Sequence, residues 1–206
     1  MFNNHTKMKS FYNVCLLIII LIITSSQVFS KTDNPPSDKY LLVLDLQDYY
    51  LKNSLNNNEA EAYISVVNEL ISKTKKENII YIKSTHKVLN LSLKPPFIYV
   101  TLDTSAMQLN EKLSIVNQNI FIKEKPNAFS VDELTEFLKS KNVEEIIIVG
   151  LLAEECVYKT SIGGLENNYD VFIVPHAILG KSEKSKNKKI EKLREKGVNI
   201  LDISYF

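Results

Sequence analysis

A carboxylic acid, an amine and a thiol each follow a short apolar segment of this 206-residue chain. Asp45 comes after the run 40–44, Lys123 ends the segment 119–123, and Cys156 lies just beyond the run 145–150. A thiol can attack a carbonyl carbon, a carboxylate can take up and return the thiol proton, and a lysine can stabilise negative charge. Each residue alone has a plainer interpretation as a turn, surface or core residue. Together they suit covalent acyl transfer.

The surroundings of Cys156 bear on its reactivity. A helix is predicted over 156–168, and a helix N-terminus offers N–H donors and a positive dipole end that favour thiolate over thiol. A nearby Lys123 would add to this, whereas Glu154 and Glu155 would oppose it. Free N–H groups between Gly150 and Cys156 could form an oxyanion hole. We therefore expect a thiol with a lowered pKa.

Strand and helix signals alternate through the chain that must position these residues. Apolar runs predict strands at 40–44, 78–82, 97–101, 119–123, 145–150, 170–174 and 199–203. Apolar residues at helical spacing predict helices over 60–76, 156–168 and 184–196. A further helix is expected to begin at Ser130, which with Glu133 has the pattern of a capping box. The irregular segment 84–118 is expected to supply binding loops.

This alternation predicts an α/β fold, a three-layer α/β/α sandwich with a mainly parallel sheet of about six strands. Parallel strands need helical crossovers, and these place helices on both faces of the sheet. In open α/β sheets a site lies outside the carboxyl ends of the strands, where Asp45, Lys123 and Cys156 are expected to meet. Gly163 and Gly164 are interpreted as a close-packing site in the helix after Cys156.

The first 30 residues resemble a secretory signal peptide. Lys7 and Lys9 precede ten uninterrupted apolar residues at 14–23, and a polar stretch then leads to Ser30. The apolar core is shorter than the roughly 20 residues that span a bilayer. We therefore expect residues 1–30 to be a cleaved signal peptide, residues 31–206 to be a single domain, and the mature protein to be periplasmic or secreted, without membrane attachment. The alternative is an uncleaved N-terminal anchor.

The composition excludes several classes of protein. The chain has 25 Lys and Arg against 24 Asp and Glu, and 45% of its residues are hydrophobic, as in an ordinary folded protein. A net charge of +1 gives no basic excess for a nucleic acid partner. Removal of residues 1–30 leaves Cys156 as the one cysteine, which disfavours a thiol-redox protein because no resolving cysteine remains.

The order of these blocks resembles the isochorismatase-like cysteine hydrolases, from about residue 40 to residue 203. The residues that carry the resemblance are Asp45-Leu46-Gln47-Asp48-Tyr49, Lys123 with Asn127-Ala128-Phe129, Val149-Gly150-Leu151-Leu152-Ala153-Glu154-Glu155-Cys156-Val157, Thr160, and Tyr169-Asp170-Val171. The resemblance implies that Cys156 is the nucleophile, Asp45 the general base and acid, and Lys123 the electrostatic support.

The resemblance also implies the rest of the site. It places a cis peptide at Leu151–Leu152, and it makes the backbone N–H groups of Leu152 and Cys156 the donors to the oxyanion. Substrate contacts are expected from Gln47, Asn127 and Phe129.

A departure from the family bears on metal binding. Nicotinamidases of this family bind a metal through the pattern D-x-H-x-x-H, where this chain reads Ser84-Thr85-His86 and has no second histidine at the required spacing. No metal and no cofactor are therefore expected. A second departure is His176, which stands where members commonly have an acid.

The sequence thus predicts an exported cysteine hydrolase that cleaves a small amide or related C–N bond through a covalent thioester. Its expected partner is a small-molecule substrate. Members of the family are often oligomers, and the sequence does not decide whether this chain forms a homo-oligomer. Two alternatives stay open, a nicotinamidase-type amidase and a catalytically inactive binding protein that keeps the fold.

Overall fold

The computed structural model describes residues 39–54 and 57–206; the predicted signal peptide lies outside these residues. The main strands are β1 (Tyr40–Leu44), β2 (Ile79–Ser84), β5 (Ile120–Lys123), β6 (Glu145–Leu151), β7 (Asp170–Leu179) and β8 (Asn199–Ile200). The helices are α2 (Asp48–Ser54), α3 (Asn57–Lys73), α4 (Asp132–Ser140), α5 (Tyr158–Glu166) and α6 (Glu183–Glu195). None of the helices in the described ranges is long and apolar enough to cross a membrane.

The six main strands form one parallel sheet in the order β5-β2-β1-β6-β7-β8. The central strand β1 pairs with both β2 and β6, and its five residues are all buried. A strand buried on both faces must be apolar throughout, which explains why continuous apolar runs rather than alternating ones marked this sheet. The predicted fold class and sheet are confirmed.

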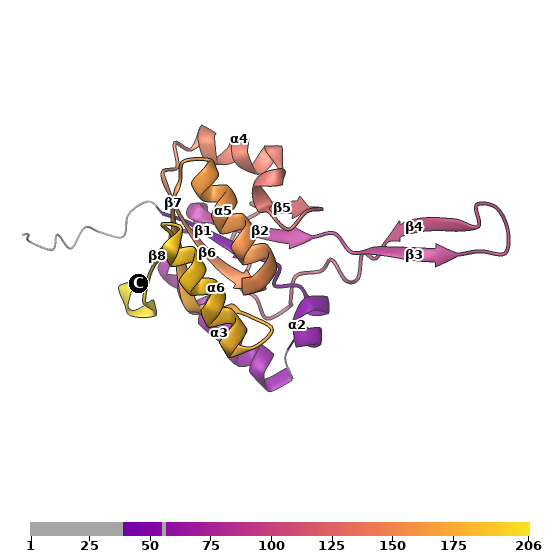
Figure 1. Ribbon diagram of the computed structural model, residues 1–206, viewed down its shortest axis with the longest axis horizontal. Coiled ribbons are helices and arrows are strands. Elements are labelled where there is room, and N and C mark those ends of the chain that lie inside the picture. Colours follow the sequence, from indigo (N-terminus) through magenta and orange to yellow (C-terminus); the bar gives the residue numbers. More distant parts are fainter. Residues whose placement is uncertain (1–38, 55–56) are drawn as a thin grey trace, which may run out of the picture. The chain divides into compact units, whose positions relative to one another are not determined.

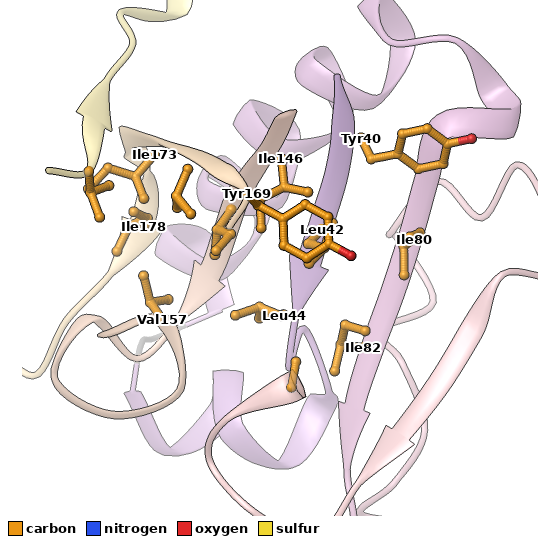
Figure 2. Packing of buried hydrophobic residues seen from close by; sticks show 14 of the residues in the cluster. Tyr40, Leu42, Leu44, Ile80, Ile82, Ile146, Val157, Tyr169, Ile173 and Ile178 are labelled. Carbon is orange, nitrogen blue, oxygen red and sulfur yellow. The ribbon is translucent and has the colours of Figure 1, made fainter. Parts of the chain in front are cut away.

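Two cores lie on the two faces of the sheet. Leu42 and Leu44 of β1 pack with α4, α5 and α6 on one face, and Figure 2 shows part of this cluster. Leu41 and Val43 point to the opposite face and pack with α2 and α3. Because side chains of a strand alternate between faces, one five-residue run supplies both cores. The helices therefore form the two outer layers of the sandwich (Figure 1).

Several helices and strands begin or end at other residues than the sequence predicted. The prediction of a capping box at Ser130 is wrong. Helix α4 begins at Asp132 and has no side-chain cap. Ser130 Oγ instead donates to the carbonyl of Asn127 in a short 3-10 turn. β7 continues to Leu179, past the predicted end at Val174. β8 has only two residues, and α2 is an element that the sequence did not reveal.

The segment 84–118 contains a hairpin outside the main sheet. Strand β3 (Lys87–Leu91) pairs antiparallel with β4 (Ile98–Leu102), which is the additional strand expected at 97–101. The two strands form a sheet of their own and extend away from the sandwich in Figure 1.

Candidate active site

Four neighbouring strands end at one edge of the sheet, and each delivers a polar side chain there. Lys123 is the last residue of β5 and Ser84 the last residue of β2, paired with it in register. Asp45 follows β1, and Cys156 lies after β6. The strand order β5-β2-β1-β6 thus explains why residues as far apart in sequence as Asp45 and Cys156 meet.

Hydrogen bonds and an ion pair connect these four side chains. Lys123 Nζ lies 2.9 Å from Asp45 Oδ2 and donates to Cys156 Sγ at 3.1 Å. Ser84 Oγ accepts from Lys123 Nζ at 2.5 Å and donates to Asp45 Oδ1 at 2.8 Å. The ammonium group therefore has three partners, which suits its three N–H donors. The structure brings together the three residues that the sequence singled out, and adds Ser84 to them.

The ion pair is almost inaccessible to water. Lys123 is 1% exposed and Asp45 is 2% exposed. Burial by itself lowers the pKa of Lys123, but the adjacent Asp45 and Cys156 outweigh it and raise this pKa above its ordinary value. Lys123 is therefore a fixed positive charge beside the sulfur at neutral pH.

The backbone around Asp45 and β6 is unusual at two points. Asp45 has a left-handed backbone (φ 59°), and its N–H donates to the carbonyl of Ile82 at 2.8 Å. Gly150 has φ 119°, and a Cβ there would lie 2.1 Å from the carbonyl oxygen of Leu44. Only glycine fits so close to β1, so Gly150 lets β6 run directly beside the strand that carries Asp45.

Cys156 lies in a π-helical turn over Ala153–Val157, which precedes α5. The turn follows a cis peptide at Leu151–Leu152, as the resemblance implied. The Val157 N–H donates to the carbonyl of Leu152 at 3.2 Å, a bond across five residues that marks the wide turn. The helix predicted over 156–168 thus begins three residues early and in a different form.

The thiol of Cys156 is held in its protonated form. Burial and the carboxylate of Asp45 raise the pKa of Cys156 to about 12, against the opposing effect of Lys123. The expectation of a lowered pKa is wrong, because the helix N-terminus and one lysine do not outweigh desolvation and a hydrogen bond to Asp45. At neutral pH the sulfur therefore carries its proton beside the carboxylate of Asp45.

A cavity of about 320 Å³ opens onto the sulfur. The residues that line it are Asp45, Tyr50, Ser84, Thr85, Lys123, Glu124, Lys125, Pro126, Leu151, Leu152, Glu155 and Cys156. Its volume is near the lower end for ligand sites, which suits a small molecule.

The comparison with protein families decides the assignment of the chain. The model of the isochorismatase domain matches residues 39–204, which include every residue of the site described above. The chain belongs to the isochorismatase family. Members of this family are hydrolases, and they include amidases. No curated protein sequence matches the chain closely enough to serve as a relative.

Solved structures show the same fold at low sequence identity. Pyrazinamidase of Pyrococcus horikoshii, in complex with zinc, is 21% identical with a TM-score of 0.65, over 80% of this chain and 99% of that one. The YcaC gene product of Escherichia coli, an octameric hydrolase of unknown specificity, is 16% identical with a TM-score of 0.61, over 80% and 75%. Pyrazinamidase/nicotinamidase of Streptococcus mutans is 18% identical with a TM-score of 0.59, over 79% and 99%.

The metal-binding pattern of nicotinamidases in this family does not fit the residues present here. Ser84 stands at the position of the aspartate, and its hydroxyl is used by Asp45 and Lys123. The ring of His86 packs against Tyr49, with 4.1 Å between ring centroids. Within residues 39–54 and 57–206, no three His, Cys, Asp or Glu side chains gather as a ligand set.

The three residues expected to contact substrate have other partners. Gln47 is fully buried, and its amide bonds to the backbone of Ser84 and to the carbonyl of Ala106. Asn127 accepts from the N–H of Phe129, whose ring stacks on Tyr169 at 5.4 Å. None of the three is among the residues that line the cavity. They shape the loops beside it.

Ser84 and Tyr50 are among the cavity-lining residues that sequence reasoning did not place in the site. Ser84 extends β2 two residues beyond its predicted end, and the rule that sites lie at the carboxyl ends of strands could have indicated it. Tyr50 lies on α2, where no sequence signal predicted an element. Burial and the nearby Asp45 raise the pKa of Tyr50, so its hydroxyl is a neutral hydrogen-bonding group.

Proposed function

We propose that this protein is a cysteine hydrolase that cleaves the C–N bond of a small amide. One observation carries the proposal: Lys123 Nζ lies 3.1 Å from Cys156 Sγ and 2.9 Å from Asp45 Oδ2 at the floor of a small cavity. The cavity gives a carbonyl carbon access to the sulfur, and the two buried charges supply acid–base and electrostatic assistance.

The first half of the reaction forms a thioester. Asp45 accepts the thiol proton as Sγ of Cys156 attacks the carbonyl carbon, and the carbonyl oxygen becomes an oxyanion. The C–N bond then breaks, and the protonated Asp45 returns the proton to the leaving nitrogen, which departs as ammonia or an amine. The raised pKa of Cys156 makes this transfer to Asp45 necessary, since almost no thiolate exists beforehand at neutral pH.

The second half releases the acid product. Asp45, ionised again, accepts a proton from a water molecule that attacks the thioester carbonyl. The C–S bond breaks, and the thiolate takes back the proton from Asp45 while the carboxylic acid leaves. Throughout both halves Lys123 is a fixed cation beside the sulfur, which favours the transient thiolate.

Oxyanion stabilisation is assigned to the turn before α5. We propose that the backbone N–H groups of Leu152 and Cys156 donate to the developing oxyanion. The proposal is supported by the position of Leu151, Leu152 and Cys156, which all line the cavity. Donors fixed by the backbone need no rearrangement during the reaction.

The mouth of the cavity carries charges of both signs. Lys125, Glu124 and Glu155 all line it, so a polar, uncharged or zwitterionic substrate suits it better than a strongly charged one. We propose a small primary amide as the substrate, and no nucleic acid partner.

We also propose that the protein is exported, with residues 1–30 as its signal peptide. The proposal is supported by the ten apolar residues at 14–23 after Lys7 and Lys9. N-terminal sequencing of the protein isolated from its host should give Lys31 as the first residue. An N-terminus at residue 1 or 2 would contradict it.

The experiment is a set of small primary amides, nicotinamide included, with ammonia release and intact protein mass as readouts, each with and without added Zn²⁺. We expect ammonia release without metal and an acyl adduct on the wild-type chain and on Glu155→Gln, which removes a charge from the cavity wall and the ion pair with Lys181 but leaves Asp45, Lys123 and Cys156 in place. Cys156→Ala should show neither. Hydrolysis of nicotinamide only with Zn²⁺ would favour the nicotinamidase-type alternative. No ammonia and no adduct with any amide would favour a binding protein without catalysis.

A further inference from the structure

One face of the β3–β4 hairpin consists almost entirely of large apolar side chains. The pairs Leu89–Val100 and Leu91–Ile98 lie opposite each other in register on this face. Leu89 is 65% exposed, Leu91 79%, Ile98 61% and Val100 58%. Leu93 and Phe97, in the connecting loop, add further exposed apolar surface at the tip of the hairpin. We call these six residues the arm face.

The opposite face of the hairpin is different. It carries the pairs Val88–Thr101 and Asn90–Tyr99, and Asn90 Nδ2 donates to Thr101 Oγ1 at 2.8 Å. An apolar face backed by a more polar one is the pattern of a sheet that is covered on one side. In the described ranges 39–54 and 57–206, the arm face is left half to fully exposed.

An uncovered hairpin of this kind is not stable by itself. Two strands alone are at best marginally stable in water, and monomeric proteins rarely expose apolar patches above roughly 300–600 Å². Six large apolar residues that are each more than half exposed offer an area on the order of the 800 Å² that each partner contributes to a stable complex. The arm face is therefore sized for a macromolecular partner.

We propose that the partner is the arm face of a second copy of this chain. Within β3 and β4, the one charged side chain in register with this face is Lys87 at its base, and it is paired with Glu124 of its own chain at 2.7 Å. A two-fold axis through the central Leu89–Val100 pair would place apolar residue against apolar residue and the lysine of each copy at opposite ends. Both copies would bury the same residues, as an isologous interface requires.

The arm is anchored at the candidate active site. β3 begins three residues after Ser84, and the N–H of Asp103, just after β4, donates to the carbonyl of His86 at 2.8 Å. The carbonyl of Ala106 accepts from Gln47 at 3.0 Å. A dimer that forms through two arm faces would therefore also restrain the loop that follows Ser84. The inference itself does not depend on the protein being a hydrolase.

The experiment measures the mass of the purified full chain by light scattering across a concentration range. We expect a two-chain mass for the wild type. Val100→Lys should weaken dimerisation by about a hundredfold or more, because each dimer contains the substitution twice at its centre. The matched control is Thr101→Lys, which adds the same charge at the next residue on the opposite face and should leave the mass unchanged. Circular dichroism checks that both variants fold.

A second measurement keeps the proposal testable if Val100→Lys does not fold. In a chain with Cys15 and Cys156 replaced by serine, a short bis-maleimide should link Val100→Cys into a dimer and should not link Thr101→Cys, because packed sheet faces lie about 10 Å apart. A monomeric wild type, or equal cross-linking from both positions, would overturn the proposal. Binding of monomers to phosphatidylcholine vesicles, lost in Val100→Lys alone, would overturn it in favour of a membrane.

Discussion

At the residue scale, Asp45 and Lys123 act on Cys156 in opposite directions. The carboxylate raises the pKa of the thiol and the ammonium group lowers it, and burial adds to the effect of the carboxylate. The free protein therefore holds a proton between sulfur and carboxylate rather than a permanent thiolate. Such a resting state protects the sulfur, since thiols oxidise much less readily than thiolates.

Asp45→Asn should make the thiol more reactive towards alkylation while removing hydrolysis. The substitution takes away a negative charge and leaves Lys123, so the pKa of Cys156 falls below about 12. We expect iodoacetamide to react about tenfold faster at pH 8, where thiolate is scarce in the wild type. Amide hydrolysis should fall by about 10²–10⁴-fold because the proposed general base is lost.

The matched control is Asp48→Asn, the same change three residues further on, at a residue that pairs with Asn110 and lies outside the cavity. It should leave the alkylation rate against pH as in the wild type. Slower alkylation of Asp45→Asn than of the wild type would show that the carboxylate does not hold the thiol proton.

Ser84→Ala tests the hydroxyl that bridges Asp45 and Lys123. Loss of its two hydrogen bonds leaves both charges less well positioned, and we expect hydrolysis to fall about tenfold. Ser84→Thr keeps the hydroxyl and should keep most of the activity. Alkylation against pH should also change in Ser84→Ala, because Lys123 would move relative to the sulfur. Equal activity of the alanine and threonine variants would exclude a role for the hydroxyl.

At the element scale, the sequence predicted the strands of the main sheet well because burial on both faces requires unbroken apolar runs. Of the two hairpin strands, it predicted only β4. β4 is apolar at four of its five positions, whereas Lys87 and Asn90 interrupt β3, and nothing local shows that the two strands pair. The start of α4 was misplaced for a similar reason, because Ser130 bonds to a residue before the helix rather than within it.

The contact between β1 and β6 should be intolerant of any side chain at Gly150. In Gly150→Ala the new Cβ would lie 2.1 Å from the carbonyl oxygen of Leu44 and 2.7 Å from its nitrogen, both fixed backbone atoms. We expect the free energy of unfolding to fall by about 4 kcal/mol or more, or the chain not to fold. Urea denaturation gives the value.

Gly197→Ala is the control for backbone conformation alone. Gly197 also has a positive φ, 96°, but a Cβ there would meet nothing within 4 Å. It should therefore cost only about 1–2 kcal/mol. If both variants lost a similar free energy of unfolding, the backbone conformation, and not the close approach of β6 to β1, would explain why a side chain is not tolerated at Gly150.

At the scale of the whole molecule, one rule accounts for what the sequence revealed about the site. Parallel strands end together, so Asp45, Lys123 and Cys156 could be brought to one edge without knowledge of the strand order. The protonation state of Cys156 could not be predicted in this way, because it depends on burial and on which carboxylate oxygen faces the sulfur. The partners of Gln47 and Asn127 likewise depend on loops whose course the sequence does not indicate.

The two layers on one side of the molecule are joined by a buried tyrosine that should govern stability at high pH. Tyr63 of α3 donates to the carbonyl of Ala177 in β7 at 3.0 Å, and burial raises its pKa far above its ordinary value. The unfolded chain releases this proton above about pH 10, whereas the folded chain keeps it. Stability is therefore fully present below pH 10 and decreases as the pH rises further, by about 1.4 kcal/mol per pH unit from this group.

Tyr63→Phe separates this effect from other alkaline groups. It removes the hydrogen bond and should cost about 1 kcal/mol at pH 7. Above pH 10 the free energy of unfolding of the variant should fall less steeply than that of the wild type. The two slopes should differ by about 1.4 kcal/mol per pH unit, because the variant has no phenol to ionise at this position. Cys156, whose pKa is also raised, destabilises both proteins equally at these pH values. Urea denaturation at intervals between pH 7 and pH 11 measures both slopes, and parallel slopes would show that Tyr63 ionises without unfolding the chain.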